Sequence, residues 1–191
     1  MTLTLRVFVL VCVAHGVAWG QPADRGTLQA AVDRFKAVDI NGQRVAMQDL
    51  RGRVVLLDFW ATWCAPCLAE IPTLREVQRR FGERVVIVGV SVDVQDRASF
   101  VGWLRRQEID WPQVFDGRGW TSPTVMPFEL TGVPFNVLVG TDGRVVGVGV
   151  RGQQLLRSID VLLEATTVRP TLANGHERRT ASCGARQATR P

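Results

Sequence analysis

An apolar run that leads directly into a closely spaced pair of cysteines constrains the fold of this chain more than any other feature. The run, residues 54–59 (VVLLDF), is typical of a buried strand, and the residues that follow Cys64-Ala-Pro-Cys67 have helical character up to residue 81. Two cysteines three residues apart at the start of a helix share one face, and a small local adjustment brings them to disulfide distance. Because a disulfide that closes so short a loop stabilises little, we expect a redox-active pair, with a purely structural disulfide as the alternative.

The predicted position of the pair also predicts how the two thiols differ. The unpaired N–H groups and the positive end of the dipole at a helix N-terminus favour a thiolate. We expect Cys64 to be the exposed nucleophile, and Cys67, one turn further along, to be the more buried thiol that resolves a mixed disulfide. Pro66 fits between them because N–H groups in the first helical turn have no partner within the helix.

A zinc site is a competing interpretation of the pair, and it would need two further ligands. The remaining cysteines and histidines are Cys12, His15, His176 and Cys183, all in the terminal segments of the chain. We therefore predict that the protein holds no metal ion and needs no cofactor.

The segment around the pair, Asp58-Phe-Trp-Ala-Thr-Trp-Cys-Ala-Pro-Cys67, resembles the active site of thioredoxins. The wider sequence is similar to the TlpA/ResA-like group of extracytoplasmic thiol–disulfide oxidoreductases, in the redoxin or AhpC/TSA-like superfamily. The matching segments are residues 37–45, 50–53, 132–134 and 137–146. The resemblance covers about residues 35 to 165 and implies a thioredoxin fold, an α/β domain in which helices flank a central mixed β-sheet, here with an N-terminal β-hairpin extension.

The resemblance implies roles for three further residues. Asp58 precedes Cys64 by six residues, where thioredoxins keep a buried acid, and burial would raise its pKa and let it exchange a proton with Cys67. Glu70 matches an acidic position near the cysteines of ResA-like proteins, and Pro134 in Gly-Val-Pro matches the cis-proline that faces them. The alternatives are a strand-end aspartate in an ordinary hydrogen bond for Asp58 and a solvated first-turn acid for Glu70.

A groove for client polypeptides is also implied. Its residues would be Trp63, Pro66, Val133 and Pro134. The group usually has threonine after the cis-proline, whereas this chain has Phe135-Asn136, a departure that bears on client choice and not on redox chemistry. The segment 111–120 is rich in aromatic residues, which we expect to cover an edge of the core, with a place on the rim of the site as the alternative.

The chain divides into four predicted segments. Residues 1–20 have the pattern of a secretory signal, with Arg6, an apolar run over residues 7–17 and small residues before Gln21. That run is short for a membrane span, although an uncleaved N-terminal anchor is an open alternative. Residues 21–34 are predicted to be a linker, residues 35–165 the thioredoxin-like domain, and residues 166–191 a basic disordered tail.

The net charge of +5 comes from the termini, because residues 21–165 carry equal numbers of basic and acidic residues. We therefore predict no nucleic-acid partner. Residues 147–152 spell G-x-G-x-x-G, but no further strand with an acid follows, so we predict no nucleotide binding either.

Local patterns predict the order of elements within the domain. It is a hairpin that turns at Asn41-Gly42, a strand at 54–59, a helix at 64–81 with a kink at Pro72, a strand at 85–92, a helix at 96–107 capped by Asp93 or Asp96, a hairpin of residues 137–140 and 144–150, and a helix at 153–165.

These observations predict a periplasmic or secreted thiol–disulfide oxidoreductase that reduces client-protein disulfides through Cys64 and Cys67. The proline directly before Cys67 is similar to that of reducing thioredoxins and favours a reductant. The resemblance implies client proteins and a membrane thiol electron-transfer partner, with a role such as keeping apocytochrome c reduced.

Two other functions compete with this prediction. A thiol peroxidase of the peroxiredoxin type would have proline and threonine where this chain has Leu57 and Ala61. A non-enzymatic metal carrier would need further soft or imidazole ligands.

Overall fold

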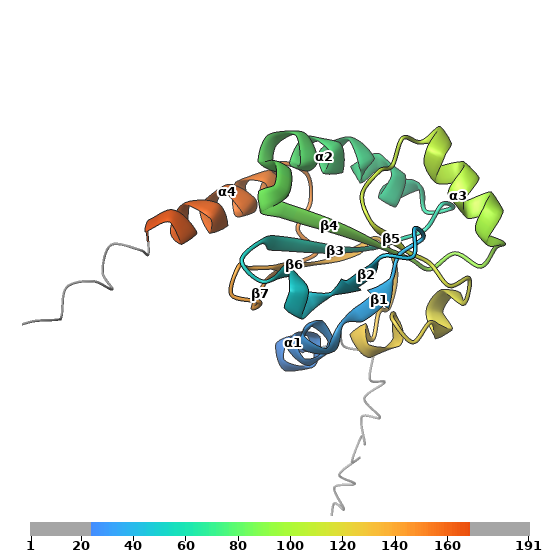
Figure 1. Ribbon diagram of the computed structural model, residues 1–191, viewed down its shortest axis with the longest axis horizontal. Helices are drawn as coiled ribbons and strands as arrows, with labels where there is room; N and C mark the ends of the chain where they lie inside the picture. The colour runs from blue at the N-terminus through green and yellow to red at the C-terminus, as the bar shows by residue number, and fades with distance from the viewer. Residues whose placement is uncertain (1–23, 169–191) are drawn as a thin grey trace, which may run out of the picture.

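The computed structural model describes residues 24–168, in which a five-stranded mixed β-sheet carries helices on both faces (Figure 1). The strand order is β5-β4-β3-β6-β7, with β3 at Val54–Trp60, β4 at Val85–Ser91, β5 at Gln113–Val114, β6 at Phe135–Val139 and β7 at Val145–Val148. β3, β4 and β5 are parallel, whereas β6 runs antiparallel to both of its neighbours, β3 and β7. This is the predicted thioredoxin fold.

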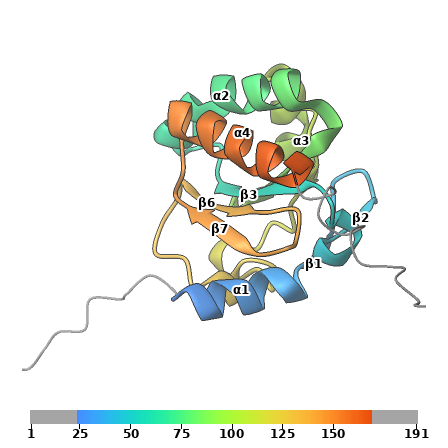
Figure 2. The same ribbon diagram turned by 90° about the vertical axis from the view of Figure 1, so that its left-hand side faces the viewer.

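Alternation along β3 assigns its side chains to two separate cores. Val54 and Leu56 pack in the cluster that contains most of the buried residues of α2 (Ala65–Phe81) and those of α4 (Gly152–Val168). Val55, Leu57 and Phe59 pack in the other cluster, with the buried residues of α1 (Arg25–Arg34). The helix α3 (Arg97–Arg106) lies on the side of α2, where its Phe100 and Trp103 rings contact Trp60. Figure 2 shows α2 and α4 on one side of the sheet and α1 on the other. Position 58 therefore faces the side that α2 and α4 cover.

The segment 25–34, predicted to be part of a linker, is helix α1, so that prediction is wrong. Asp24 caps the helix by accepting hydrogen bonds from the N–H groups of Gly26 at 2.7 Å and Thr27 at 3.1 Å. Leu28, Ala31 and Val32 follow at helical spacing and are buried in the core. The folded domain thus begins at least ten residues earlier than predicted.

The predicted hairpin is present as β1 (Lys36–Val38) and β2 (Arg44–Ala46), which pair antiparallel. The last helix, α4, ends at Val168, so residues 166–168 belong to a helix and not to the predicted disordered tail. The rest of the predicted tail, the predicted signal segment and the four residues weighed as extra zinc ligands lie outside the described residues. None of the helices in residues 24–168 is long and apolar enough to cross a bilayer.

The helix that follows the cysteine pair, α2, continues through Pro72, and the kink predicted there stays a prediction. Asp96, and not Asp93, caps α3, because its carboxylate accepts a hydrogen bond of 2.9 Å from the N–H of Ser99. Four short 3-10 helices complete the described chain. They are η1 (Met47–Leu50), η2 (Gly82–Arg84), η3 (Gly119–Thr121) and η4 (Met126–Phe128).

The aromatic segment 111–120 covers an edge of the core in part, as predicted. Trp111 is buried, and the ring of Phe115 stacks on that of Phe100 at 4.2 Å. Trp120 does not follow the prediction, since it is exposed on η3. The segment also contains β5, which the sequence patterns did not predict because a two-residue strand is too short to show alternation.

The glycine-rich segment 147–152 connects β7 to α4. A Cβ atom at Gly147 would lie 2.8 Å from a methyl carbon of Val150, so glycine permits the close approach of the chain after the strand.

Candidate functional site

The predicted cysteine pair lies at the N-terminus of α2 and is closed as a disulfide. Cys64 is the N-cap residue, Cys67 lies in the first turn, and the S–S distance is 2.05 Å. The N–H of Cys67 donates a hydrogen bond to the Sγ atom of Cys64 at 3.3 Å. This donor, together with the positive end of the helix dipole, would stabilise a thiolate on Cys64 in the reduced protein.

The predicted difference in exposure between the two cysteines is wrong for the disulfide form. Cys64 is 4% exposed and Cys67 is 5% exposed. The side chain of Cys64 folds back over the helix end to reach the sulfur and the N–H of Cys67, and this orientation removes it from solvent. The difference between the two thiols therefore rests on their electrostatic surroundings and not on their accessibility in the oxidised protein.

The loop that leads to Cys64 is held by Asp93, a residue to which the sequence patterns assigned no such role. Its buried carboxylate accepts hydrogen bonds from the Thr62 N–H at 3.0 Å, the Thr62 hydroxyl at 2.6 Å and the Ser91 hydroxyl at 2.7 Å. Asp93 follows β4 as Thr62 follows β3, and the carboxyl ends of adjacent parallel strands meet at one edge of the sheet. A polar residue shortly after each of two predicted neighbouring strands is therefore the sequence signal that could have identified Asp93.

The predicted cis-proline is confirmed, because the Val133–Pro134 peptide bond is cis. The register of β3 and β6 pairs Phe59 with Phe135, so Pro134 lies beside the end of β3 from which the chain runs to Cys64. Val133 and Pro134 are half-buried. On the other side, Trp63 is 61% exposed and Pro66 is exposed, so the predicted groove residues are available to a client polypeptide.

Asp58 lies on β3, on the face that α2 and α4 cover, and its side chain is half-buried instead of fully enclosed as predicted. Burial raises the pKa of Asp58 from an ordinary 3.8 to about 7, while the positive charge of Arg151 lowers the pKa and the negative charge of Glu70 raises it. Its carboxyl group can therefore carry or release a proton near neutral pH.

Glu70 is half-buried on α2, and its carboxylate accepts a hydrogen bond of 3.2 Å from the N–H of Gly152, the first residue of α4. Glu70 is therefore close enough to raise the pKa of Asp58, and its carboxylate also caps the start of α4. Arg151, which the sequence patterns did not single out, donates a hydrogen bond to the carbonyl oxygen of Pro134.

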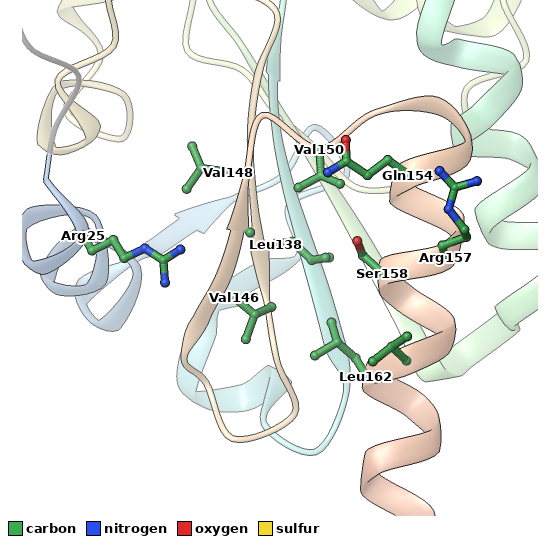
Figure 3. A pocket seen from close by; sticks show the side chains of 11 residues that line it. Arg25, Leu138, Val146, Val148, Val150, Gln154, Arg157, Ser158 and Leu162 are labelled. Atoms are coloured by element: carbon green, nitrogen blue, oxygen red, sulfur yellow. The ribbon is translucent and has the colours of Figure 1, made fainter.

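A cavity of about 560 Å³ lies away from these groups, between α4, β7 and the start of α1 (Figure 3). Its walls are mostly valine and leucine side chains, with Arg25, Gln154, Arg157 and Ser158 at the edges. Neither cysteine lines it. No group of three or more potential ligand residues within positions 24–168 is arranged to hold a metal ion.

Comparison with known proteins places the chain in a family. The family model described as AhpC/TSA matches residues 28–146. The chain belongs to the AhpC/TSA family. Thiol-disulfide oxidoreductase ResA of Bacillus cereus is 26% identical over 172 residues, which cover 86% of this chain and 96% of that protein. ResA of Bacillus subtilis is 31% identical over 116 residues, 60% of this chain and 62% of that protein.

Solved structures agree with this AhpC/TSA assignment. The C-terminal domain of a thiol-disulfide oxidoreductase from Bacteroides thetaiotaomicron has a TM-score of 0.62 and 25% identity over 69% of this chain and 92% of that chain. The structure of MTB DsbF in mixed oxidised and reduced forms has a TM-score of 0.58 and 27% identity over 69% of this chain and 97% of that chain. The predicted resemblance to TlpA/ResA-like thioredoxin-fold oxidoreductases is therefore confirmed.

Proposed function

We propose that this protein reduces disulfide bonds in client polypeptides outside the cytoplasm, by exchange through Cys64 and Cys67. The observation that carries the proposal is the placement of the pair at the N-terminus of α2, at the end of the sheet where cis-Pro134 also lies. The similarity to proteins named thiol-disulfide oxidoreductase ResA supports the same chemistry.

The reaction would proceed in two exchange steps. The thiolate of Cys64 attacks a client disulfide, a Cys64–client disulfide forms, and the other client sulfur leaves as a thiolate that takes a proton from water. Cys67 then gives its proton to Asp58 and attacks the sulfur of Cys64, which releases the second client sulfur as a thiolate. The client gains two electrons, and the protein ends as the Cys64–Cys67 disulfide.

The client would bind along the surface that the groove residues form. A backbone next to a cis-proline offers an edge with which an extended chain can pair. Trp63, exposed directly before Cys64, would contact client side chains that flank the attacked cysteine. The same surface would serve the thiol partner that returns electrons to the protein, which by resemblance is a membrane protein.

The proposal also assigns a reducing direction and an extracytoplasmic location. The direction rests on Pro66 directly before Cys67, and the location on the signal-like pattern of residues 1–20 and on the resemblance to the ResA-like group. A role in keeping apocytochrome c or other client thiols reduced belongs to the proposal on the same grounds.

Trapping of clients tests the proposal directly. In a Cys183→Ser background, which removes the cysteine of the C-terminal segment, Cys67→Ala should accumulate a disulfide between Cys64 and its clients in the native compartment. Cys64→Ser should trap nothing and should fail to reduce a polypeptide disulfide such as that of insulin. Reduction of insulin by Cys64→Ser at the wild-type rate would overturn the proposal.

Two assays separate the competing functions. A thiol peroxidase would consume hydrogen peroxide with a reductant present, and the buried Leu57 and Ala61 supply no hydroxyl group near the cysteine to activate a peroxide. A metal carrier would retain copper or zinc in equilibrium dialysis. We expect neither peroxide turnover nor retained metal.

A further inference from the structure

Arg151 connects two parts of the site that lie far apart in the sequence. It directly precedes α4, and its guanidinium donates a hydrogen bond to the carbonyl oxygen of Pro134 in the proposed client groove. The next residue, Gly152, donates its N–H to Glu70 on α2. The start of α4 is therefore bonded both to the cis-proline loop and to the helix that carries the cysteines.

The charge of Arg151 also acts on Asp58. Arg151 and Glu70 are the charged groups whose interaction with Asp58 perturbs its pKa, and they act in opposite directions. The residues that pair with Asp58 in the sheet, Gly89 on β4 and Asn136 on β6, carry no charge. Within residues 24–168, Arg151 is therefore the cation that favours the ionised form of Asp58.

The Nε atom of Arg151 is in an energetically unfavourable environment. It is buried and has no hydrogen-bond partner among the described residues. A buried donor without a partner is unfavourable, so the position of the guanidinium is explained by its hydrogen bond to Pro134 and its charge interaction with Asp58, and not by complete hydrogen bonding.

We infer that Arg151 is a positioning residue, whose guanidinium fixes the carbonyl of Pro134 in the client groove and holds a positive charge near Asp58. Arg151 is kept there because Val150, directly before it, exchanges hydrogen bonds of 2.8 Å and 3.0 Å with Asn136, which pairs with Asp58 in the sheet. The inference rests on the proposed function, in which Asp58 accepts the proton of Cys67 as Cys67 attacks the Cys64–client disulfide. Burial alone would keep Asp58 protonated and unable to act as a base. The cation makes the base available while a client is bound at Pro134.

The test measures the resolution step as a function of pH. Reduced protein with Cys12→Ser and Cys183→Ser is mixed rapidly with dithiobis(nitrobenzoate), which releases one coloured thiolate when Cys64 attacks and a second when Cys67 resolves the mixed disulfide. The rate of the second release is measured across a pH range. In Arg151→Met, the midpoint of this pH dependence should move to higher pH by about one unit or more, because the group that lowered the pKa of Asp58 is gone. At pH 7, a rise of about one unit from the wild-type pKa of about 7 lowers the ionised fraction of Asp58 from about a half to about a tenth, so the second release should slow by roughly fivefold.

Three variants make the result specific. Arg151→Lys keeps the charge and should keep the midpoint within a few tenths of a unit of wild type. Arg157→Met removes an exposed arginine of α4 that has no ion-pair partner among the described residues. It should change neither the rate nor the pH midpoint of the first or the second thiolate release. In an Asp58→Asn background, Arg151→Met should produce no further shift, because the responding carboxyl group is absent.

The outcomes separate this inference from the proposed function. A wild-type midpoint in Arg151→Met, or the same shift with Asp58→Asn present, would refute the role of Arg151 while insulin reduction through Cys64 still stood. Failure of wild type and of Arg157→Met alike to reduce insulin would count against the proposed function itself. If Arg151→Met does not fold, Arg151→Gln gives the same neutral test with a polar side chain.

Discussion

Replacement of Asp58 by asparagine tests the half-buried carboxyl group through stability as well as rate. The pKa of Asp58 is about 7 in the folded protein, against an ordinary value of 3.8. Below the ordinary value both states hold the proton, and the folded state has its full stability. As the pH rises from about 3.8 to about 7, the unfolded chain has lost a proton that the folded protein still holds, so stability falls over this range and levels off once the folded state has lost the proton as well.

The size of the effect follows from the shift. About three pKa units at 1.36 kcal/mol each set a ceiling of about 4 kcal/mol. Asp58 keeps some solvent contact, which screens the charge, so we expect about 1–2 kcal/mol. Asparagine cannot ionise, and Asp58→Asn should therefore be as stable as wild type at pH 4 and more stable by this amount at pH 8.

The assay is urea unfolding of the oxidised protein at both pH values, with Asp110→Asn, the same change at an exposed position, as the control. The resolution step should also slow, by at most the 10²–10⁴ that is typical of lost general acid–base catalysis. An unchanged pH dependence of stability in Asp58→Asn would contradict the raised pKa. Wild-type turnover across pH 6–9 would contradict the proton-transfer role.

Three further outcomes can be measured. In the reduced protein the thiol of Cys64 should titrate below the unperturbed value of about 8.5, and iodoacetamide should label it before Cys67; equal labelling rates would reverse or remove the assignment. The disulfide potential should lie nearer the roughly −270 mV of thioredoxin than the roughly −120 mV of a strong oxidant, and a value above about −180 mV in glutathione equilibrium would indicate an oxidase or isomerase. Gly89→Ala should destabilise by about 1–3 kcal/mol in thermal unfolding, because its Cβ would lie 2.3 Å from the buried side chain of Gln113. Gly102→Ala, in the interior of α3 with only a flexible arginine nearby, should instead stabilise by about 0.5–1 kcal/mol, and similar losses in both would contradict the packing argument.

The central part of the fold was predictable because its signals are local. The apolar run of β3 and the cysteine pair predict a strand and a helix without knowledge of any neighbour. Helix α1 was missed because its buried face consists of only three residues, Leu28, Ala31 and Val32, in an otherwise polar segment. Its cap, Asp24, was the signal that could have been read.

The residues of the site divide into those that a local sequence motif identifies and those that depend on distant partners. Cys64, Cys67 and Pro134 belong to short motifs and were found from the sequence. Asp93 and Arg151 act through partners about 20 to 90 residues away, which the order and register of the strands bring together. No local pattern carries that information, and it becomes visible only once β3 is known to lie between β4 and β6.

The hydrogen bonds from Thr62 to Asp93 have a consequence for the rate of disulfide closure. They anchor the approach to Cys64 without using either sulfur atom, as does the hydrogen bond of 3.1 Å from the Cys64 N–H to the Ala61 carbonyl. Reduction breaks the S–S bond and leaves these contacts in place. The two thiols then remain neighbours at a high effective concentration, so attack by Cys67 competes well with any thiol from solution for the mixed disulfide.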